Sequence, residues 1–431
     1  MKRTIKVDYL ARVEGEGALT IELVDGRAES VKLRIFEPPR FFEAFLRGRA
    51  ASEAPDITAR ICGICPVAYQ MSACHAIEAA LGVTLPESLR ALRRLLYAGE
   101  WIQSHALHVF MLHAPDFLGY EDALAMAKDH AELVKQGLFV KQAGNAILRV
   151  LGGREVHPIN VKVGGFYRLP RVDELAPLLP TLERARETME AALGTFAGLP
   201  FPDFERDYEF VALRHASDYP FSEGRIVSSA GLDIAVADYD AHFVEEQVPH
   251  STALHARLRA RGAYLCGPLS RLNLNFDRLR ERARASADAI GFEVPCKNPF
   301  KGLLARGIEL VQALDEACAI VAAYQAAGPA SVEVPRAAGT GHGATEAPRG
   351  LLYHRYVIDE TGAIEAAQIV PPTSQNQRSM EEDLSELAPK LASLPHAEAT
   401  WLAEQSIRNY DPCISCSTHF LKLKLVESGN A

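Results

Sequence analysis

The chain has 431 residues, which is long enough for one large domain with insertions or for two closely packed lobes. Its net charge of −9 argues against a surface that binds nucleic acid or an anionic membrane. The first residues, Met1 to Asp8, contain no apolar signal core, and no run of about 18 apolar residues predicts a membrane span.

Strand and helix patterns follow one another along the chain. Residues 1–35 alternate apolar and polar side chains around an Asp25-Gly26 turn, which predicts an N-terminal sheet. Apolar residues then recur at helical spacing, and Pro66 fits the first turn of a helix. The predicted helices are 41–48, 66–81, a long buried helix over 86–113, and then 121–150, 174–193, 302–327 and 380–407.

The remaining segments favour strands and loops. Residues 205–265 and 331–372 are predicted to be rich in strands, and residues 152–166 to form a glycine-punctuated loop. The glycines at 339, 341 and 343 lack the spacing and context of a dinucleotide-binding loop, so no nucleotide site is expected here. We predict a helix-dominated α+β fold in which residues 1–431 form a single domain and both chain ends converge.

Two Cys-x-x-Cys pairs lie at opposite ends of the chain, Cys62 with Cys65 and Cys413 with Cys416. In a long chain without a secretory segment, such pairs favour metal binding or catalysis over disulfides. Their spacing alone leaves open a redox or catalytic metal, a structural zinc ion and a dithiol redox site. The other cysteines stand alone and are predicted to be small buried residues: Cys74, Cys266, Cys296 and Cys318.

Distinctive motifs flank these cysteines. They read Arg60-Ile-Cys62-Gly-Ile-Cys65 and Asp411-Pro-Cys413-Ile-Ser-Cys416-Ser-Thr-His419. Shorter motifs occur in a fixed order around them: Arg12-Val-Glu14-Gly, Ser104-His105-Ala-Leu-His108, Pro115-Asp116-Phe117, Gly152 to Pro158, Gly343 to Gly350 and Val370 to Asn376. Over nearly the whole chain this set resembles the large, catalytic subunit of nickel–iron hydrogenases. The residues after Cys65 look most like the cytoplasmic group that is coupled to NAD(P) or of sulfhydrogenase type.

The resemblance implies a fold with a core of long helices and small peripheral sheets, built around a metal centre. That centre would contain nickel and an iron that carries CO and cyanide. Cys62 and Cys413 match the terminal nickel thiolates, and Cys65 and Cys416 match the thiolates that bridge nickel and iron. The implied reaction is the reversible heterolytic oxidation of H2 to protons and electrons, with Cys413 as the nearest base.

Other positions match residues around the metals in that family. Glu14 matches the carboxylate that takes the proton onward, a role for which burial can raise the pKa of a glutamate into the working range. Arg349 matches an arginine above the metals, with Asp411 as its partner. Pro348 and Thr373 match residues that contact the cyanide ligands, although the run Pro-Pro-Thr-Ser leaves a shift by one position open.

A second metal is implied near the C-terminus. Glu43 and His419 match the ligands of a structural magnesium or iron ion, and both metals accept oxygen and imidazole ligands. Without the resemblance, Glu43 would be interpreted as a solvated helix residue. The tail 420–431 is either a peptide that is cleaved after nickel insertion or a retained mature end.

The implied partners follow from what the chain lacks. It has no second cysteine set for an iron–sulfur cluster, so an iron–sulfur small subunit is expected. The resemblance to the NAD(P)-coupled group implies that flavin- and NAD(P)-binding diaphorase and ferredoxin-like subunits complete the assembly. Two alternatives stay open: a non-catalytic scaffold related to the quinone-facing subunit of respiratory NADH dehydrogenase, and a structural zinc protein. Tyr69, Glu16 and Ser104 depart from the family pattern and are expected to alter hydrogen bonding around the centre.

Overall fold

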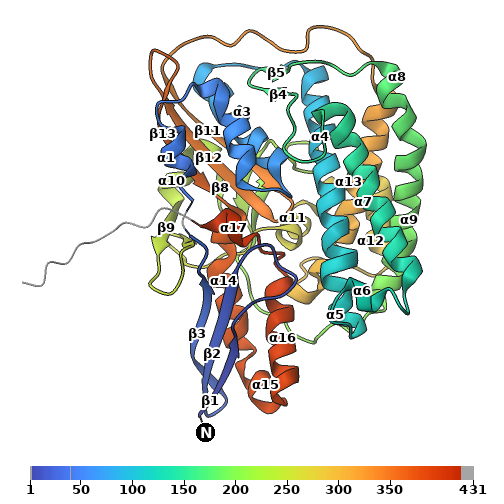
Figure 1. The fold of residues 1–431 in the computed structure, drawn as a ribbon, viewed down its shortest axis with the longest axis vertical. Helices are drawn as coiled ribbons and strands as arrows, with labels where there is room; N and C mark the ends of the chain where they lie inside the picture. Colours follow the sequence, from blue (N-terminus) through green and yellow to red (C-terminus); the bar gives the residue numbers. More distant parts are fainter. Residues whose placement is uncertain (1, 39, 419–431) are drawn as a thin grey trace, which may run out of the picture.

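The computed structural model describes residues 2–38 and 40–418. Long helices form one half of it (Figure 1), where α4 (Glu87–Ala106) packs against α7 (Ala131–Gly152) and α13 (Gly302–Ala323), and α13 packs against α9 (Leu179–Ala197). Every residue of α13 from Gly302 to Leu314 is buried, so this helix lies at the centre of the helical half. The other α-helices are α1 (Phe42–Leu46), α2 (Ala54–Thr58), α3 (Pro66–Leu81), α5 (Ala114–Leu118), α6 (Ala123–Met126), α8 (Val172–Leu175), α10 (Tyr239–His242), α11 (Pro268–Asn275), α12 (Glu281–Ala289), α14 (Pro372–Glu386), α15 (Ala388–Ser393), α16 (His396–Arg408) and α17 (Ile414–Ser417).

Small antiparallel sheets make up much of the other half (Figure 1). The predicted N-terminal sheet is confirmed as β1 (Lys2–Val7), β2 (Gly17–Val24) and β3 (Arg27–Ile35). A second sheet contains β11 (Gly339–Ala347), β12 (Gly350–Ile358) and β13 (Ile364–Val370). The smaller sheets are β4 (Val161–Lys162) with β5 (Gly165–Phe166), β6 (Val211–Arg214) with β7 (Arg225–Ser228) and β8 (Asp233–Ile234), and β9 (Phe243–Gln247) with β10 (Leu254–Leu258).

The predicted helices differ from the observed ones mainly where a turn interrupts them. Residues 86–113 are helical as predicted, but the last turns, Leu107–His113, are π-helical and lead into α5 at Pro115. A proline has no N–H to donate to the preceding turn, which favours such a change of hydrogen bonding. The single helices predicted over 121–150 and 380–407 are wrong: Asp122 caps the short helix α6, and prolines start α15 and precede α16.

The glycine-rich strand β11 serves close packing. A Cβ atom at Gly343 would lie 2.6 Å from the backbone nitrogen of Ala76 in α3, and one at Gly339 or Gly341 would be closer still to the α3 backbone. These three glycines share one face of the strand because side chains alternate. The face therefore packs directly on α3, and the hairpin turn after β11 is fixed relative to the start of that helix.

The two ends of the described chain meet, as the sequence predicted. Glu14 forms a parallel bridge with Cys413, and the Ile414 N–H donates to the Glu14 carbonyl at 2.8 Å. No helix among the described residues is both long enough and apolar enough to cross a membrane.

Candidate metal centre

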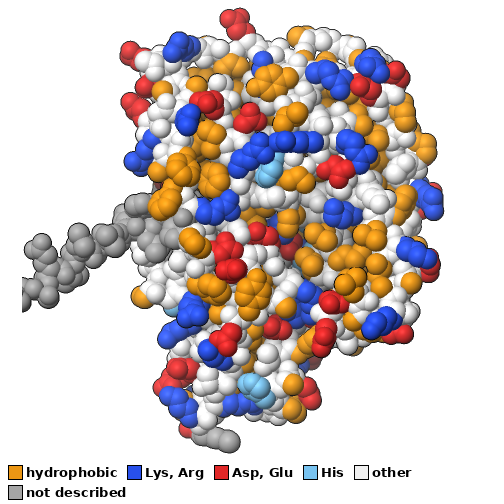
Figure 2. Space-filling view, in the orientation of Figure 1, with side chains coloured by type: hydrophobic (Ala, Val, Ile, Leu, Met, Phe, Trp, Pro, Cys, Tyr) orange, Lys and Arg blue, Asp and Glu red, His pale blue; other side chains and the backbone are white. Residues whose placement is uncertain are grey.

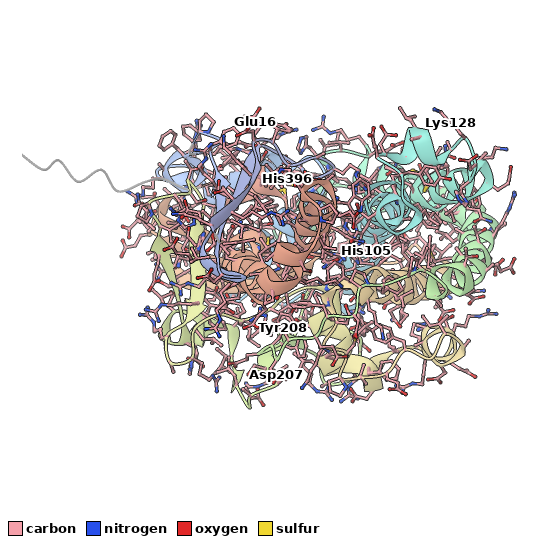
Figure 3. All side chains as sticks on the ribbon, turned by 90° about the horizontal axis from the view of Figure 1, so that it is seen from below. Glu16, His105, Lys128, Asp207, Tyr208 and His396 are labelled. Atoms are coloured by element: carbon pink, nitrogen blue, oxygen red, sulfur yellow. A yellow bond between two sulfur atoms is a disulfide. The ribbon has the colours of Figure 1, made fainter. Side chains whose placement is uncertain are left out.

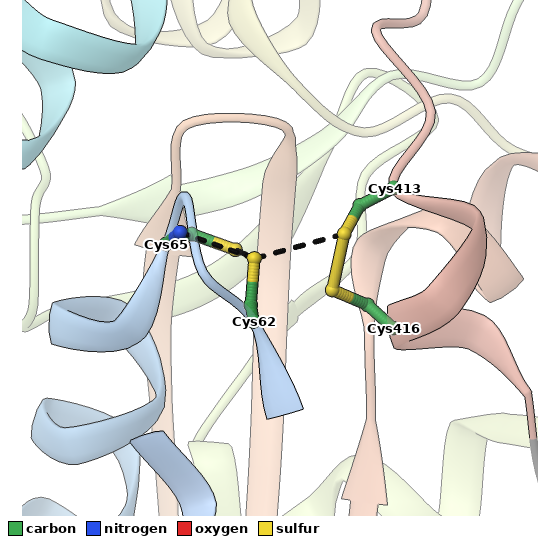
Figure 4. Close-up of side chains that lie close together, drawn as sticks. All are labelled: Cys62, Cys65, Cys413 and Cys416. Carbon is green, nitrogen blue, oxygen red and sulfur yellow. Dashed lines mark hydrogen bonds between the residues drawn. A yellow bond between two sulfur atoms is a disulfide. The ribbon is translucent and has the colours of Figure 1, made fainter. Parts of the chain in front are cut away.

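Four cysteine side chains from the two ends of the chain meet in the interior (Figure 4). Cys62 follows a short helical turn and Cys65 immediately precedes α3, while Cys413 precedes α17 and Cys416 lies within it. Each is at most 6% exposed, and their four Sγ atoms lie within 4.8 Å of one another. The two pairs that are remote in sequence form one cluster.

The sulfur atoms are paired within this cluster. Cys62 Sγ lies 2.8 Å from Cys65 Sγ and 3.7 Å from Cys413 Sγ. Cys413 and Cys416, whose Cα atoms are 5.4 Å apart, form a disulfide, whereas the sequence predicted four thiolates. Two cysteines at this separation can bond covalently. Metal ligation requires the reduced pair, because the thiolate is the metal ligand.

The surroundings of Cys62 favour a thiolate. Burial opposes ionisation, but the hydrogen bond from Cys65 and the positive charge of Arg349 outweigh it, so the pKa of Cys62 is lowered. The N–H groups of Ile64 and Cys65 also donate to Cys62 Sγ, at 3.3 and 3.1 Å. The pKa of Cys65 is raised well above its usual range because it donates to Cys62 and is buried. The surroundings therefore favour ionisation of Cys62 over ionisation of Cys65.

Arg349 brings a buried positive charge to the cluster. It lies at the tip of the β11–β12 hairpin, where Ala347 pairs with Gly350. Its Nε donates to the Asp411 carbonyl at 2.5 Å, and its Nη2 lies 3.2 Å from Asp411 Oδ1. Asp411, Cys65 and Cys62 outweigh burial and raise the pKa of Arg349. Burial raises the pKa of Asp411, although Arg349 opposes the shift.

Arg349 and Asp411 each keep one polar atom unused. Arg349 Nη1 and Asp411 Oδ2 have no hydrogen-bond partner among residues 2–38 and 40–418. Leaving such buried groups unpaired costs about 1–3 kcal/mol each. A polar or anionic group bound beside the cysteines would offer Arg349 Nη1 an acceptor. Four clustered sulfurs and an unpaired guanidinium N–H therefore fit a soft metal centre that carries anionic ligands.

Glu14 and Thr373 contact Cys413 from two sides. Cys413 Sγ lies 3.0 Å from Glu14 Oε2, which also accepts from the Ser415 N–H at 3.1 Å. Thr373, in the first turn of α14, accepts a hydrogen bond from the Cys413 N–H at 3.0 Å. The carbonyl of Pro348, next to Arg349, accepts from Arg271 at 3.0 Å. The sequence-predicted residues of the centre thus lie on connected segments around Cys413.

The comparisons with known proteins agree with this geometry. A family model described as nickel-dependent hydrogenase matches residues 40–146 and 302–419. The alpha subunit of sulfhydrogenase 2 from Pyrococcus furiosus is 36% identical over 97% of this chain and 100% of its own length. This chain belongs to the nickel-dependent hydrogenase family. It is a catalytic large subunit of the nickel–iron type, an oxidoreductase that acts on H2.

Other relatives of this hydrogenase subunit extend the agreement. The beta subunit of the NAD-reducing hydrogenase HoxS from Cupriavidus necator is 27% identical over 98% of this chain and 96% of its own length. A solved NAD+-reducing nickel–iron hydrogenase in the H2-reduced state has a TM-score of 0.89 and 30% identity, covering 97% of this chain and 99% of that one. The predicted fold is confirmed, and the four-cysteine cluster fits a nickel–iron centre.

The second predicted metal site lies partly outside the described residues. Glu43 in α1 accepts a hydrogen bond from the Ile369 N–H at 2.7 Å, and burial raises its pKa. It lines a cavity of about 380 Å³ that also reaches Glu245, Cys416 and Thr418. His419 and the tail 420–431 lie outside the residues that the structure describes.

One hydrogenase residue close to the centre was not predicted from the sequence. Glu100 in α4 is completely buried, and its carboxylate accepts from the N–H groups of Val67 and Ala68 at 2.6 and 3.0 Å. It thus binds the N-terminal turn of α3, directly after Cys65. Burial and the charge of Cys62 raise the pKa of Glu100 well above its usual range, despite these hydrogen bonds. A single carboxylate within a long apolar run was the available signal.

The departures from the family pattern have different surroundings. Tyr69 is buried, and burial and the charges of Cys65 and Cys62 raise the pKa of its hydroxyl. Its Oη and the Ser104 Oγ have no partner among the described residues. Glu16 is exposed at the molecular surface (Figure 3). Tyr69 is therefore the departure that lies against the thiolates, whereas Glu16 faces solvent.

Proposed function

We propose that this hydrogenase subunit activates H2 in a cytoplasmic complex that exchanges electrons with NAD(P), by the reversible reaction H2 ⇌ 2H⁺ + 2e⁻. The observation that carries the proposal is the convergence of four buried cysteines with Arg349 at the meeting point of the two chain ends. The relatives that reduce NAD+ support NAD(P) as the electron acceptor. Because NAD(P) is a cytoplasmic nucleotide, this acceptor also supports a cytoplasmic location.

The cysteines would hold the two metals unequally. Cys62 and Cys413 would be terminal ligands of nickel, and Cys65 and Cys416 would bridge nickel to an iron that carries CO and cyanide. When bound, this centre supplies the heterolytic cleavage of H2. The lowered pKa of Cys62 supports its binding to a metal as a thiolate, because less free energy is needed to remove its proton.

The proton would leave through the residues that contact Cys413. Cys413 Sγ lies 3.0 Å from Glu14 Oε2, so a proton held on this sulfur in the reduced pair would be within hydrogen-bonding distance for direct transfer. The Ser415 N–H orients the same carboxylate oxygen. Glu14 would accept the proton and pass it outward.

Polar groups around the cysteines would hold the ligands of the iron. Arg349 would donate from its unpaired Nη1, with Asp411 fixing the guanidinium plane. Pro348 and Thr373 would contact the cyanide ligands, and Thr373 also accepts from the Cys413 N–H, which fixes the start of α17. Glu43, with His419, would bind a magnesium or iron ion beside the cavity that reaches Cys416.

Electrons would pass to an iron–sulfur small subunit, with which large subunits of this family pair. Figure 2 shows hydrophobic side chains gathered on the face that carries α1, α6 and α7. Exposed apolar residues in these segments include Phe45, which is 61% exposed, and Leu124, which is 82% exposed. Apolar surface of this kind supports a subunit contact on this face. Flavin-binding diaphorase and ferredoxin-like subunits would complete the path to NAD(P).

Metal analysis of the purified, matured complex tests the proposal. We expect nickel and an extra iron at about one equivalent each, infrared bands from CO and cyanide, and H2-dependent reduction of NAD+ or NADP+. The variant Cys416→Ser should lose nickel and all H2-dependent activity. Zinc bound to the four cysteines would indicate a structural site, and a complex without nickel or infrared bands would indicate a scaffold; either result would refute the proposal.

A further inference from the structure

Two histidines and a glutamate form a second cluster of metal-ligating groups, remote in sequence from the cysteines. His250 lies in the β9–β10 turn, His255 in β10 and Glu381 in α14. One ligating atom from each lies within 4.8 Å of the other two. His250 Nε2 is 2.8 Å from Glu381 Oε1, and the two imidazole rings meet edge to face with centroids 5.6 Å apart.

His255 is a buried histidine with a ring nitrogen left unpaired among the described residues, which packing alone does not explain. The residue is 2% exposed, and its Nε2 has no hydrogen-bond partner in the part of the chain that the structure describes. Leaving a buried polar atom without a partner destabilises the folded protein. Burial, followed by the neighbouring charges of His250 and Arg378, lowers the pKa of His255 to about 3. The imidazole is therefore neutral at physiological pH, the form that binds metals.

The other two ligands are held in place by the fold. Glu381 Oε1 accepts from the Leu33 N–H of β3 at 2.9 Å as well as facing His250. The nearby cation Arg378 is already paired with Glu246, which also pairs with Arg257. The arrangement therefore offers one carboxylate and two imidazoles to a metal ion.

We propose that His250, His255 and Glu381 bind a divalent transition-metal ion of the zinc type. Two imidazoles and one carboxylate leave a fourth position for water, which is typical of open zinc sites. The side chains of His250 and Glu381 are 22% and 18% exposed, so an ion can enter from solvent.

The bound ion would join the β9–β10 turn to α14. This turn also packs on β3, because Thr252 donates to the carbonyls of Ile35 and Glu37, and Ala253 bridges to Thr418. A metal at this point would hold the turn against the strand that precedes α1 and against the segment that follows Cys416. The site shares no residue with the cysteine cluster.

The test uses the purified, matured complex, in which the cysteines are occupied. After treatment with a chelator that leaves the nickel content unchanged, the complex is titrated with Co2+ and metal content and visible absorption are measured. His250→Ala, chosen because His250 is partly exposed, is compared with His396→Ala, a surface histidine of α16 (Figure 3). A second variant, Glu381→Gln, removes the anionic ligand.

We expect wild type and His396→Ala to take up one equivalent of Co2+ with ligand-field bands that lack thiolate charge transfer. His250→Ala and Glu381→Gln should lose that equivalent while nickel content and thermal stability without cobalt stay close to wild type. Zn2+ should displace the bound Co2+ from wild type and raise its Tm, and it should not raise the Tm of His250→Ala or Glu381→Gln. Equal cobalt uptake by all four proteins, or no uptake by wild type, would overturn the proposal.

Discussion

Arg271 offers a quantitative test of how the fold holds the active-site turn. It is completely buried in α11, and its Nε and Nη2 each lie 2.7 Å from an oxygen of Glu309 in α13. Its Nη1 lies 3.1 Å from Glu346, and it donates to the carbonyls of Ala347 and Pro348 at 2.9 and 3.0 Å. One guanidinium therefore joins the central helix to the turn that carries the arginine of the centre.

Arg271→Met should destabilise the subunit strongly. The change leaves Glu309 and Glu346 buried without their cation, and breaking a buried ion pair in this way costs about 3–5 kcal/mol. A chain of 431 residues has an unfolding entropy of about 0.9 kcal/mol per kelvin near its Tm. The Tm should therefore fall by about 3–6 °C. Arg271→Lys should give a smaller fall because it keeps the positive charge, but some fall should remain because an ammonium cannot replace the planar fork.

The assay is thermal unfolding of the purified complex by scanning calorimetry, with nickel content measured on the same samples. Arg225→Met is the matched control, since Arg225 pairs with Asp233 at the surface, where ion pairs contribute about 0–1 kcal/mol. The control should lower the Tm by about 1 °C or less. If Arg271→Met lowers the Tm no more than Arg225→Met, the buried network does not stabilise the turn and the reasoning is refuted.

Three further predictions concern the centre and its surroundings. Glu14→Gln should keep nickel but slow H2-dependent dye reduction by about 10²–10⁴-fold, whereas Glu16→Gln at the surface should match wild type; full activity of Glu14→Gln would exclude this proton exit. Thr373→Val leaves the buried Cys413 N–H unpaired at a cost of about 1–3 kcal/mol and should lower the nickel content, and Thr373→Ser should restore it; unchanged nickel in the valine variant would contradict this. Burial lowers the pKa of His354 to about 3, below its unfolded value of about 6.5, so its contribution to stability is full above pH 6.5 and is lost by about 1.4 kcal/mol per pH unit below it. As the pH falls from 6.5 to 5, the Tm of His354→Phe should therefore rise relative to the Tm of wild type. A Tm difference that does not change with pH would disprove the lowered pKa of His354.

Local signals explain which parts of the fold the sequence predicted well. The helix 66–81 is bounded by a proline at its start and a left-handed glycine after its end, and it was predicted to the residue. Residues 86–113 were predicted as one helix, but the π-helical turn at their end depends on the packing around Pro115. The spacing of apolar residues gives no information on that packing. That residues 1–431 form a single domain stays a prediction.

The site was predictable where motifs carried it. The cysteine motifs predict that Cys62 and Cys413 belong to one centre, and the four sulfurs do form one cluster. Contacts between residues that are remote in the sequence and belong to no motif could not be predicted from the sequence. Arg271 and Glu309 were among many arginines and glutamates, and only the structure shows that they are buried together. The roles of Glu14 and Thr373 remain proposals.

Isotope exchange by the matured complex tests whether the centre held by the four cysteines cleaves H2 heterolytically. A complex of this chain with its small subunit, loaded with nickel, is exposed to D2 in H2O without any electron acceptor, and the gas is followed by mass spectrometry. If the cysteine cluster cleaves H2 heterolytically, HD should form before H2, and the Cys62→Ser complex should form neither. A nickel-loaded complex that produces no HD would contradict the account.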